Sequence, residues 1–131
     1  MRILVIDDEP AVADLLADAL RHDGHDPTVA ASGELGLVAM EEMHPDAVFL
    51  DVAMPDMSGI EVLRRIRALH PSLPVVLITG NAEAAEIREA KRLGISEVIE
   101  KPGILNGVTE VFAALERNQP DSTAGLTGRD V

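Results

Sequence analysis

Short runs of aliphatic, mostly β-branched residues recur along the chain, and longer stretches of helical character separate them. This alternation is typical of a parallel β-sheet covered by helices on both faces, because parallel strands need long crossovers between them. The five predicted strands are Arg2–Ile6, Asp26–Ala30, Ala47–Leu50, Val75–Ile78 and Glu97–Ile99. The second and fifth are the most polar, and we expect them at the edges of the sheet.

The first and third helices carry clear signals of their own. Ser58 followed by Glu61 fits a capping box, which predicts the start of the third helix. The apolar positions that follow in that helix are Ile60, Leu63, Ile66 and Leu69. The apolar residues of the first helix recur at a spacing that places them on one face. They are Val12, Leu15, Leu16, Ala19 and Leu20.

The fourth helix, Ala82–Leu93, has a helix-favouring composition. Its large apolar residues are only Ile87 and Leu93, so its hold on the sheet should be thin. A fifth helix is expected over residues 105–117. The polar residues after it, 118–131, are expected to be disordered.

The length of 131 residues predicts one α/β domain, residues 1–117, followed by that polar tail. Eleven Lys and Arg stand against 23 Asp and Glu, and the formal net charge of -12 repels nucleic-acid phosphates and anionic lipids. We therefore expect neither nucleic acid nor membrane as a partner. The chain has no Cys, no apolar run long enough to span a bilayer and an acidic start, which predicts a cytoplasmic protein.

Polar residues of chemical interest follow four of the five predicted strands. Asp7 and Asp8 follow the first strand, Asp51 the third, Thr79 the fourth and Lys101 the fifth. All strand carboxyl ends of a doubly wound parallel sheet lie on one edge, so these residues converge. In the flavodoxin-like strand order 2-1-3-4-5, the first and third strands are neighbours where ligands bind. We predict this (βα)5 order and one cleft that holds the aspartates.

Each of these residues also has a structural explanation when taken singly. Asp8 could help to cap the first helix, Asp51 could begin a turn, and Thr79 could cap the following helix. Lys101 could be an ordinary surface lysine. The joint presence of acids, a hydroxyl and an ammonium on one edge favours a functional site.

The chemistry that suits this set is phosphoryl transfer. Three carboxylates in one cleft repel one another and need a cation, and Mg²⁺ fits because it prefers oxygen ligands. Asp8 and Asp51 could bind it directly, and Asp7 could bind through water. A carboxylate can also attack phosphorus, and we assign that role to Asp51. Lys101 and Thr79 would stabilise the phosphoryl oxygens, and no general base is needed.

Four motifs follow one another between about Arg2 and Arg117, namely ILVIDDEP, VFLDVAMPDMSGIEVLRRIR, PVVLITG and EKP. With them the chain resembles the receiver domain of two-component response regulators, as in the single-domain chemotaxis regulator. The resemblance implies a phosphoryl donor that is a sensor histidine kinase or phosphotransfer protein. It also implies an output partner on the face of the fourth helix, fifth strand and fifth helix, and no catalysis beyond self-phosphorylation and self-dephosphorylation.

The resemblance assigns a role to each residue of the site. Asp51 is the phosphoacceptor, Asp7 and Asp8 bind metal, the backbone carbonyl of Ala53 is a further metal ligand, and Thr79 and Lys101 contact the phosphoryl group.

Two positions depart from the family pattern. The family couples a hydroxyl, here Thr79, to an aromatic side chain on the fifth strand, but the matching residue is Val98 and the chain has no Tyr or Trp. Gly103 stands where the family commonly has Phe after the Lys-Pro pair. We therefore expect the signal to pass through Thr79 and the thinly held fourth helix.

Three other functions stay open. A docking or dimerisation module of the same fold would work without phosphorylation, which the altered switch positions allow. A Mg²⁺-dependent phosphatase of the dehalogenase-like type also uses an aspartate nucleophile, but it needs an acid where this chain has Ala53. A flavin-binding module would need a Ser- and Thr-rich loop after the first strand, where this chain has DDEP.

Overall fold

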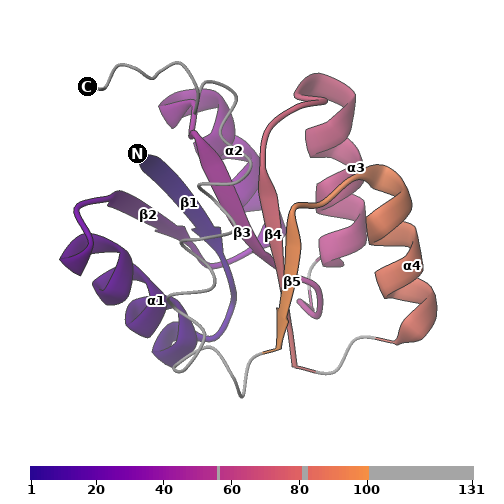
Figure 1. Cartoon of the computed structure of the whole chain (residues 1–131), viewed down its shortest axis with the longest axis horizontal. Coiled ribbons are helices and arrows are strands. Elements are labelled where there is room, and N and C mark those ends of the chain that lie inside the picture. The colour runs from indigo at the N-terminus through magenta and orange to yellow at the C-terminus, as the bar shows by residue number, and fades with distance from the viewer. Residues whose placement is uncertain (56, 81–82, 101–131) are drawn as a thin grey trace.

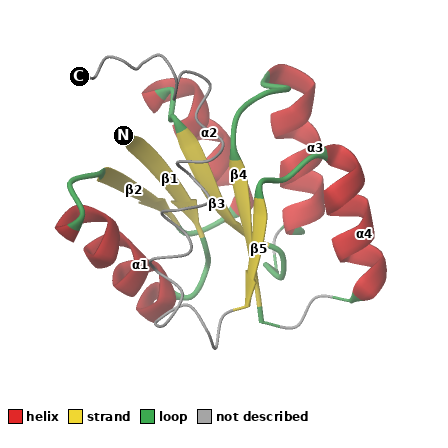
Figure 2. Ribbon diagram, in the orientation of Figure 1, coloured by secondary structure: helices red, strands yellow, loops and turns green. Residues whose placement is uncertain are grey.

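The computed structural model describes residues 1–55, 57–80 and 83–100, and shows a parallel sheet with helices on both faces (Figure 1). Helices and strands alternate along the described chain (Figure 2). In order they are β1 (Arg2–Ile6), α1 (Pro10–His22), β2 (Asp26–Ala30), α2 (Gly33–Met43), β3 (Ala47–Asp51), α3 (Gly59–Leu69), β4 (Val75–Thr79), α4 (Ala84–Leu93) and β5 (Glu97–Glu100). None of the described helices is long and apolar enough to cross a lipid bilayer.

The five strands form one parallel sheet in the order β2-β1-β3-β4-β5. This is the predicted order, and the two polar strands, β2 and β5, lie at the edges. The register pairs Ile6 of β1 with Leu50 of β3, and Asp51 with Ile78 of β4. β1, β3 and β4 therefore end at nearly the same level on one edge of the sheet.

The core is divided by the sheet into two layers. Ile3 and Val5 of β1 pack with α1 on one face, whereas Leu4 and Ile6 pack with residues of α2 and α3 on the other. Figure 1 shows α1 on one side of the sheet and α2, α3 and α4 on the opposite side. The central strands β3 and β4 are buried along their whole length, which explains their continuous apolar sequence.

The packed faces of the predicted helices differ in detail from expectation. In α1 the small residues Ala13 and Ala17 are buried, while Leu15 is exposed. In α3 the Ser58 hydroxyl accepts a hydrogen bond from the Glu61 N–H, which confirms Ser58 as the cap. The Glu61 carboxylate accepts hydrogen bonds from Arg64 and Arg65, so the second half of the predicted capping box is replaced by these ion pairs. The last apolar position of α3, Leu69, is exposed because it lies at the end of the helix.

α4 starts at Ala84, two residues later than predicted, and Ala90 is its buried residue. Ile87 and Leu93 are half-buried against the core, as the sequence pattern indicates. The predicted fifth helix, the polar tail and Gly103 lie outside the described residues.

The far end of α4 is attached to α3 by one side chain. The Arg67 guanidinium donates two hydrogen bonds, of 3.0 and 2.7 Å, to the carbonyl oxygen of Gly94. It donates a third, of 2.9 Å, to the carbonyl oxygen of His70. Partial burial lowers the pKa of Arg67 from its ordinary value, because desolvation disfavours the charged form. α4 is therefore held to the body of the domain mainly through α3.

Candidate functional site

The ends of two neighbouring strands bring the aspartates together. Asp51 is the last residue of β3, and Asp7 directly follows β1. Because Ile6 and Leu50 are paired in the register, the next residue of each strand stands side by side at the sheet edge. The convergence predicted from the strand order is therefore present among the described residues.

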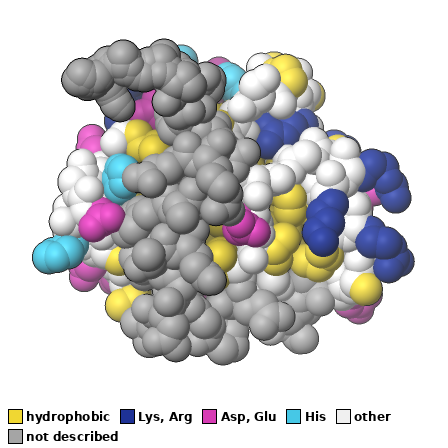
Figure 3. Space-filling model, in the orientation of Figure 1, with side chains coloured by type: hydrophobic (Ala, Val, Ile, Leu, Met, Phe, Trp, Pro, Cys, Tyr) yellow, Lys and Arg dark blue, Asp and Glu magenta, His cyan; other side chains and the backbone are white. Residues whose placement is uncertain are grey.

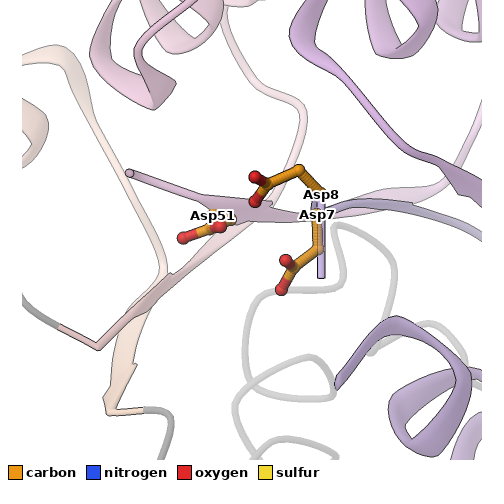
Figure 4. Close-up of side chains that lie close together, drawn as sticks. All are labelled: Asp7, Asp8 and Asp51. Carbon is orange, nitrogen blue, oxygen red and sulfur yellow. The ribbon is translucent and has the colours of Figure 1, made fainter. Parts of the chain in front are cut away.

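Asp7, Asp8 and Asp51 form a compact carboxylate cluster (Figure 4). Each offers one carboxylate oxygen, and these atoms all lie within 4.8 Å of one another. Asp7 and Asp51 are almost fully buried, with exposed fractions of 1% and 0%, and Asp8 is half-buried. Acidic side chains are seldom buried in this way, because an ionised carboxylate loses its hydration in the protein interior.

Backbone amides hold two of the carboxylates in place. The Glu9 N–H donates to Asp7 Oδ1 at 2.9 Å, and the Ala53 N–H donates to Asp51 Oδ1 at 3.2 Å. Each bond spans two residues, the local pattern by which Asp stabilises a turn. The expectation that Asp51 begins a turn is thus compatible with the site, and the same bond fixes its carboxylate orientation.

The other two capping explanations do not fit the structure. The residue at the N-cap of α1 is Glu9, not Asp8. The N-cap of α4 is Glu83, four residues beyond Thr79. Neither Asp8 nor Thr79 is therefore the N-cap residue of the helix that follows it.

Thr79 ends β4 and is buried, at the same sheet edge as the aspartates. Val98, the residue that stands at the expected aromatic position, pairs with Leu77 of β4 and is half-buried. The backbone of Ala53, the other predicted metal ligand, lies in the loop after β3. Lys101 follows β5 but lies outside the described residues.

Gly59 is a positioning residue that the residue-by-residue sequence analysis missed. A Cβ built on Gly59 would lie 2.3 Å from the carbonyl oxygen of Asp51 and 2.6 Å from the Cα of Val52. The Gly59 N–H also donates to the carbonyl oxygen of Val52 at 2.7 Å. α3 therefore begins directly against the end of β3. The available sequence signal was a Gly directly after the helix cap Ser58, in the segment PDMSG.

The electrostatics of the cluster favour a bound cation. Two unit charges 4.8 Å apart repel by on the order of 3 kcal/mol at an effective dielectric constant of about 20. Three carboxylates at such distances are strained unless a positive charge lies among them. Carboxylate oxygens are the ligands of hard divalent ions, so the residues present fit Mg²⁺.

The chain is similar to several curated response regulators. It is 35% identical over 131 residues to the DNA-binding response regulator MtrA of Mycolicibacterium smegmatis, covering 99% of this chain and 57% of that protein. It is 36% identical over 115 residues to the probable transcriptional regulatory protein TcrX of Mycobacterium tuberculosis, covering 88% of this chain and 49% of TcrX. The chain thus spans about half the length of these relatives. MtrA is named as a DNA-binding protein. The comparison therefore does not support our expectation that nucleic acid is not a partner.

Solved structures show the same fold. The receiver domain of NtrX from Brucella abortus matches with a TM-score of 0.78 and 36% identity, covering 87% of this chain and 98% of that one. A CheY-like receiver domain protein from Methanospirillum hungatei matches with a TM-score of 0.76 and 26% identity, covering 88% and 96% of the two chains. The family model of the response regulator receiver domain matches residues 3–113. With its sheet order and carboxylate cluster, the chain belongs to the response regulator receiver domain family of two-component signalling.

Proposed function

We propose that this receiver domain is switched by transfer of a phosphoryl group to Asp51 in a Mg²⁺-dependent reaction. The observation that carries the proposal is the buried cluster of Asp7, Asp8 and Asp51, with oxygens within 4.8 Å of one another. Membership of the receiver family supports phosphorylation-based signalling in general.

In the proposed reaction, a carboxylate oxygen of Asp51 attacks the phosphorus of a phosphohistidine. A phosphorus–oxygen bond forms, the phosphorus–nitrogen bond breaks, and its electron pair leaves with the imidazole ring. A carboxylate nucleophile has no proton to lose, so the step needs no general base. The Ala53 N–H keeps the Asp51 carboxylate oriented through its hydrogen bond to Oδ1. Catalysis then consists of positioning and charge stabilisation.

Asp7, Asp8, Asp51 and the Ala53 carbonyl would hold the ion. When bound, Mg²⁺ neutralises the carboxylates and the oxygens of the transferred group. Thr79, buried at the end of β4, contributes its hydroxyl to the phosphoryl group. Lys101, by its place after β5 in the sequence, contributes an ammonium.

The proposed phosphoryl donor is a sensor histidine kinase or a phosphotransfer protein. The proposed chemistry of this chain is limited to its own phosphorylation and dephosphorylation. Residues 1–117 act as the receiver domain and residues 118–131 as a polar tail. The formal net charge of -12 opposes direct contact of this chain with DNA.

The consequence of phosphorylation is proposed to travel through Thr79 and α4. Val98 offers no aromatic ring that could turn inward behind Thr79. α4 is lightly held, since Ala90 is its buried residue and α3 is its main neighbour. An element with little buried surface is the one whose position changes at the lowest free-energy cost.

The test is incubation with acetyl phosphate and Mg²⁺, followed by intact-protein mass spectrometry. We expect a mass gain of one phosphate in the unsubstituted chain, its loss in Asp51→Ala, and its retention in Asp14→Ala, a control acid that is exposed on α1. Chelation of Mg²⁺ with EDTA should abolish the gain. No gain in the unsubstituted chain would favour a docking module of the same fold that works without phosphorylation.

A further inference from the structure

Three large apolar side chains are exposed on α2 and at the end of α3. Leu69, Leu35 and Val38 have exposed fractions of 68%, 57% and 54%, the highest among large apolar residues of the described chain. Leu35 and Val38 belong to α2, and Leu69 is the last residue of α3. Of these three residues, Leu69 lines a hollow between the two helices.

A hollow of about 180 Å³ lies between these two helices. Its volume suits one large apolar side chain, and four of its lining residues are apolar. These are Leu37 and Met40 of α2 with Ile66 and Leu69 of α3. The other lining residues are Glu41, Arg65 and His70. We call this hollow the α2–α3 groove.

The groove contains a polar atom that lacks a hydrogen bond. His70 Nε2 is buried and has no hydrogen-bond partner among the described residues. Glu41 Oε2 lies 3.7 Å from it, beyond hydrogen-bond distance. A buried polar atom in this state costs free energy, and a ligand group in the groove would relieve that cost.

The charge around the groove is negative on its α2 side. α2 carries three acids and no basic residue, and Glu34 and Glu42 make no ion pair within the described part of the chain. The carboxylate of Glu41, the third acid, lies 3.7 Å from the His70 imidazole and makes no other ion pair within the described residues.

The arginines of α3 are already engaged within the domain. Arg64 and Arg65 both contact Glu61, and Arg64 also contacts Glu89. Figure 3 shows Lys and Arg gathered on the right of the molecule, where α3 and α4 lie. The negative charges of the α2 acids are therefore not neutralised by the arginines of α3. They favour a basic ligand.

We propose that the α2–α3 groove docks a basic amphipathic helix of a partner protein. One large apolar side chain enters the hollow between Met40 and Ile66, and basic residues on the adjoining face meet Glu34, Glu41 and Glu42. A helix suits this surface better than an extended peptide, because the groove walls are helices that offer no free backbone groups for strand pairing. The surface lies away from the carboxylate cluster and does not depend on phosphorylation of Asp51.

The probe is a synthetic amphipathic helical peptide with Lys on its polar face and one Trp among its apolar residues. The chain has no Trp and no Tyr, so the fluorescence of the peptide reports burial of its Trp without interference. We expect a blue shift on binding to the full chain, and amide shifts mapped to α2 and the end of α3 by NMR. A peptide with Glu in place of Lys should not bind.

Two substitutions distinguish binding in the groove from general electrostatic attraction of a basic peptide to an acidic protein. Leu69→Glu should weaken binding by about tenfold or more, because the apolar contact is lost and a charge is introduced. Leu15→Glu adds the same charge at an exposed leucine of α1 and should change binding by no more than about twofold. Leu69 is exposed, so the variant should fold, and circular dichroism of both variants checks this.

Three results would overturn the proposal. One is absence of binding by the Lys peptide, and another is an equal effect of Leu69→Glu and Leu15→Glu. The third is self-association of the chain in analytical ultracentrifugation that Leu69→Glu abolishes, which would assign the groove to a second copy of the chain. All three can be measured in Asp51→Ala, so the outcome is independent of the phosphorylation proposal.

Discussion

Gly59 stands so close to Asp51 that a methyl group at its Cα would lie 2.3 Å from the Asp51 carbonyl oxygen. The contact is with backbone, which cannot rotate away as the end of a side chain can. The first turn of α3 therefore packs against the end of β3 so closely that a side chain at residue 59 would overlap its backbone. The position of Asp51, the proposed phosphoacceptor, depends on the absence of a side chain at residue 59.

Gly59→Ala should therefore lower the free energy of unfolding by about 2 kcal/mol and displace the end of β3. Urea denaturation measures the first effect, and the rate of phosphorylation by acetyl phosphate measures the second. Gly36→Ala is the matched control, because its new methyl group would meet the side chain of Ile6 rather than backbone. An equal loss in both variants would contradict the special role of Gly59.

Removal of one carboxylate should change how Mg²⁺ affects stability. Asp8→Asn relieves repulsion in the cluster, so without Mg²⁺ the variant should be more stable than the unsubstituted chain by about 1 kcal/mol. With Mg²⁺ at a hundredfold excess over its dissociation constant, the unsubstituted chain should gain about 2.7 kcal/mol and the variant much less. Thermal melts in EDTA and in Mg²⁺ test both. A Mg²⁺ response that Asp8→Asn leaves unchanged would place the ion elsewhere.

Phosphorylation should alter amide hydrogen exchange in α4 if the signal passes through Thr79. We expect changed protection over residues 84–93 in the phosphorylated chain and a much smaller change in Thr79→Ala treated in the same way. The exchange of β1 residues serves as an internal control, because that strand is buried in the centre of the sheet. Unchanged protection in α4 on phosphorylation would rule out this route.

Loss of the Arg67 side chain should release the far end of α4. Arg67→Met keeps the aliphatic stem but removes three hydrogen bonds to the carbonyls of Gly94 and His70. We expect a loss of about 2 kcal/mol in the free energy of unfolding, since these bonds have a charged donor. Arg65→Met removes only an exposed ion pair with Glu61 and should cost less than about 1 kcal/mol. Urea denaturation distinguishes the two.

The contribution of Glu61 to stability should depend on pH. Its hydrogen bonds to Arg65 and Arg64 lower the pKa of its carboxyl from 4.5. A lowered pKa in the folded state stabilises at pH values above 4.5, and this stabilisation is lost as the pH falls through the folded pKa. The stability difference between the unsubstituted chain and Glu61→Gln should therefore be small, sensitive to salt, and absent in acid. A difference that grows as the pH falls would contradict this assignment.

The strands and the site edge were predictable because their signals are local or topological. The inner strands β1, β3 and β4 are mainly apolar runs, whereas the edge strands β2 and β5 are more polar. The observed bounds differ from the predicted ones by at most one residue at the carboxyl end, as with Asp51 and Thr79. The carboxyl ends of parallel strands share one edge, so the meeting of Asp7 and Asp51 followed from the strand order alone.

Other features depend on contacts that no sequence period records. A pattern of large apolar residues favoured Leu15 as part of the packed face of α1, but the close approach to the sheet is made by Ala13 and Ala17. The role of Gly59 arises from a backbone contact across a loop. The bond from Arg67 to Gly94 joins residues 27 positions apart, and an Arg in an amphipathic helix gives no sign of such a partner.

α3 has one further consequence, which follows from what lies at its two ends. Its first residue rests on the backbone of Asp51, and its last turn grips Gly94 through Arg67. A helix of 11 residues is a stiff rod about 16 Å long. A displacement of α3 at Asp51 would therefore also shift the turn between α4 and β5, at the opposite edge of the sheet. α3 thus contacts both places through backbone and Arg67, without an aromatic side chain between them.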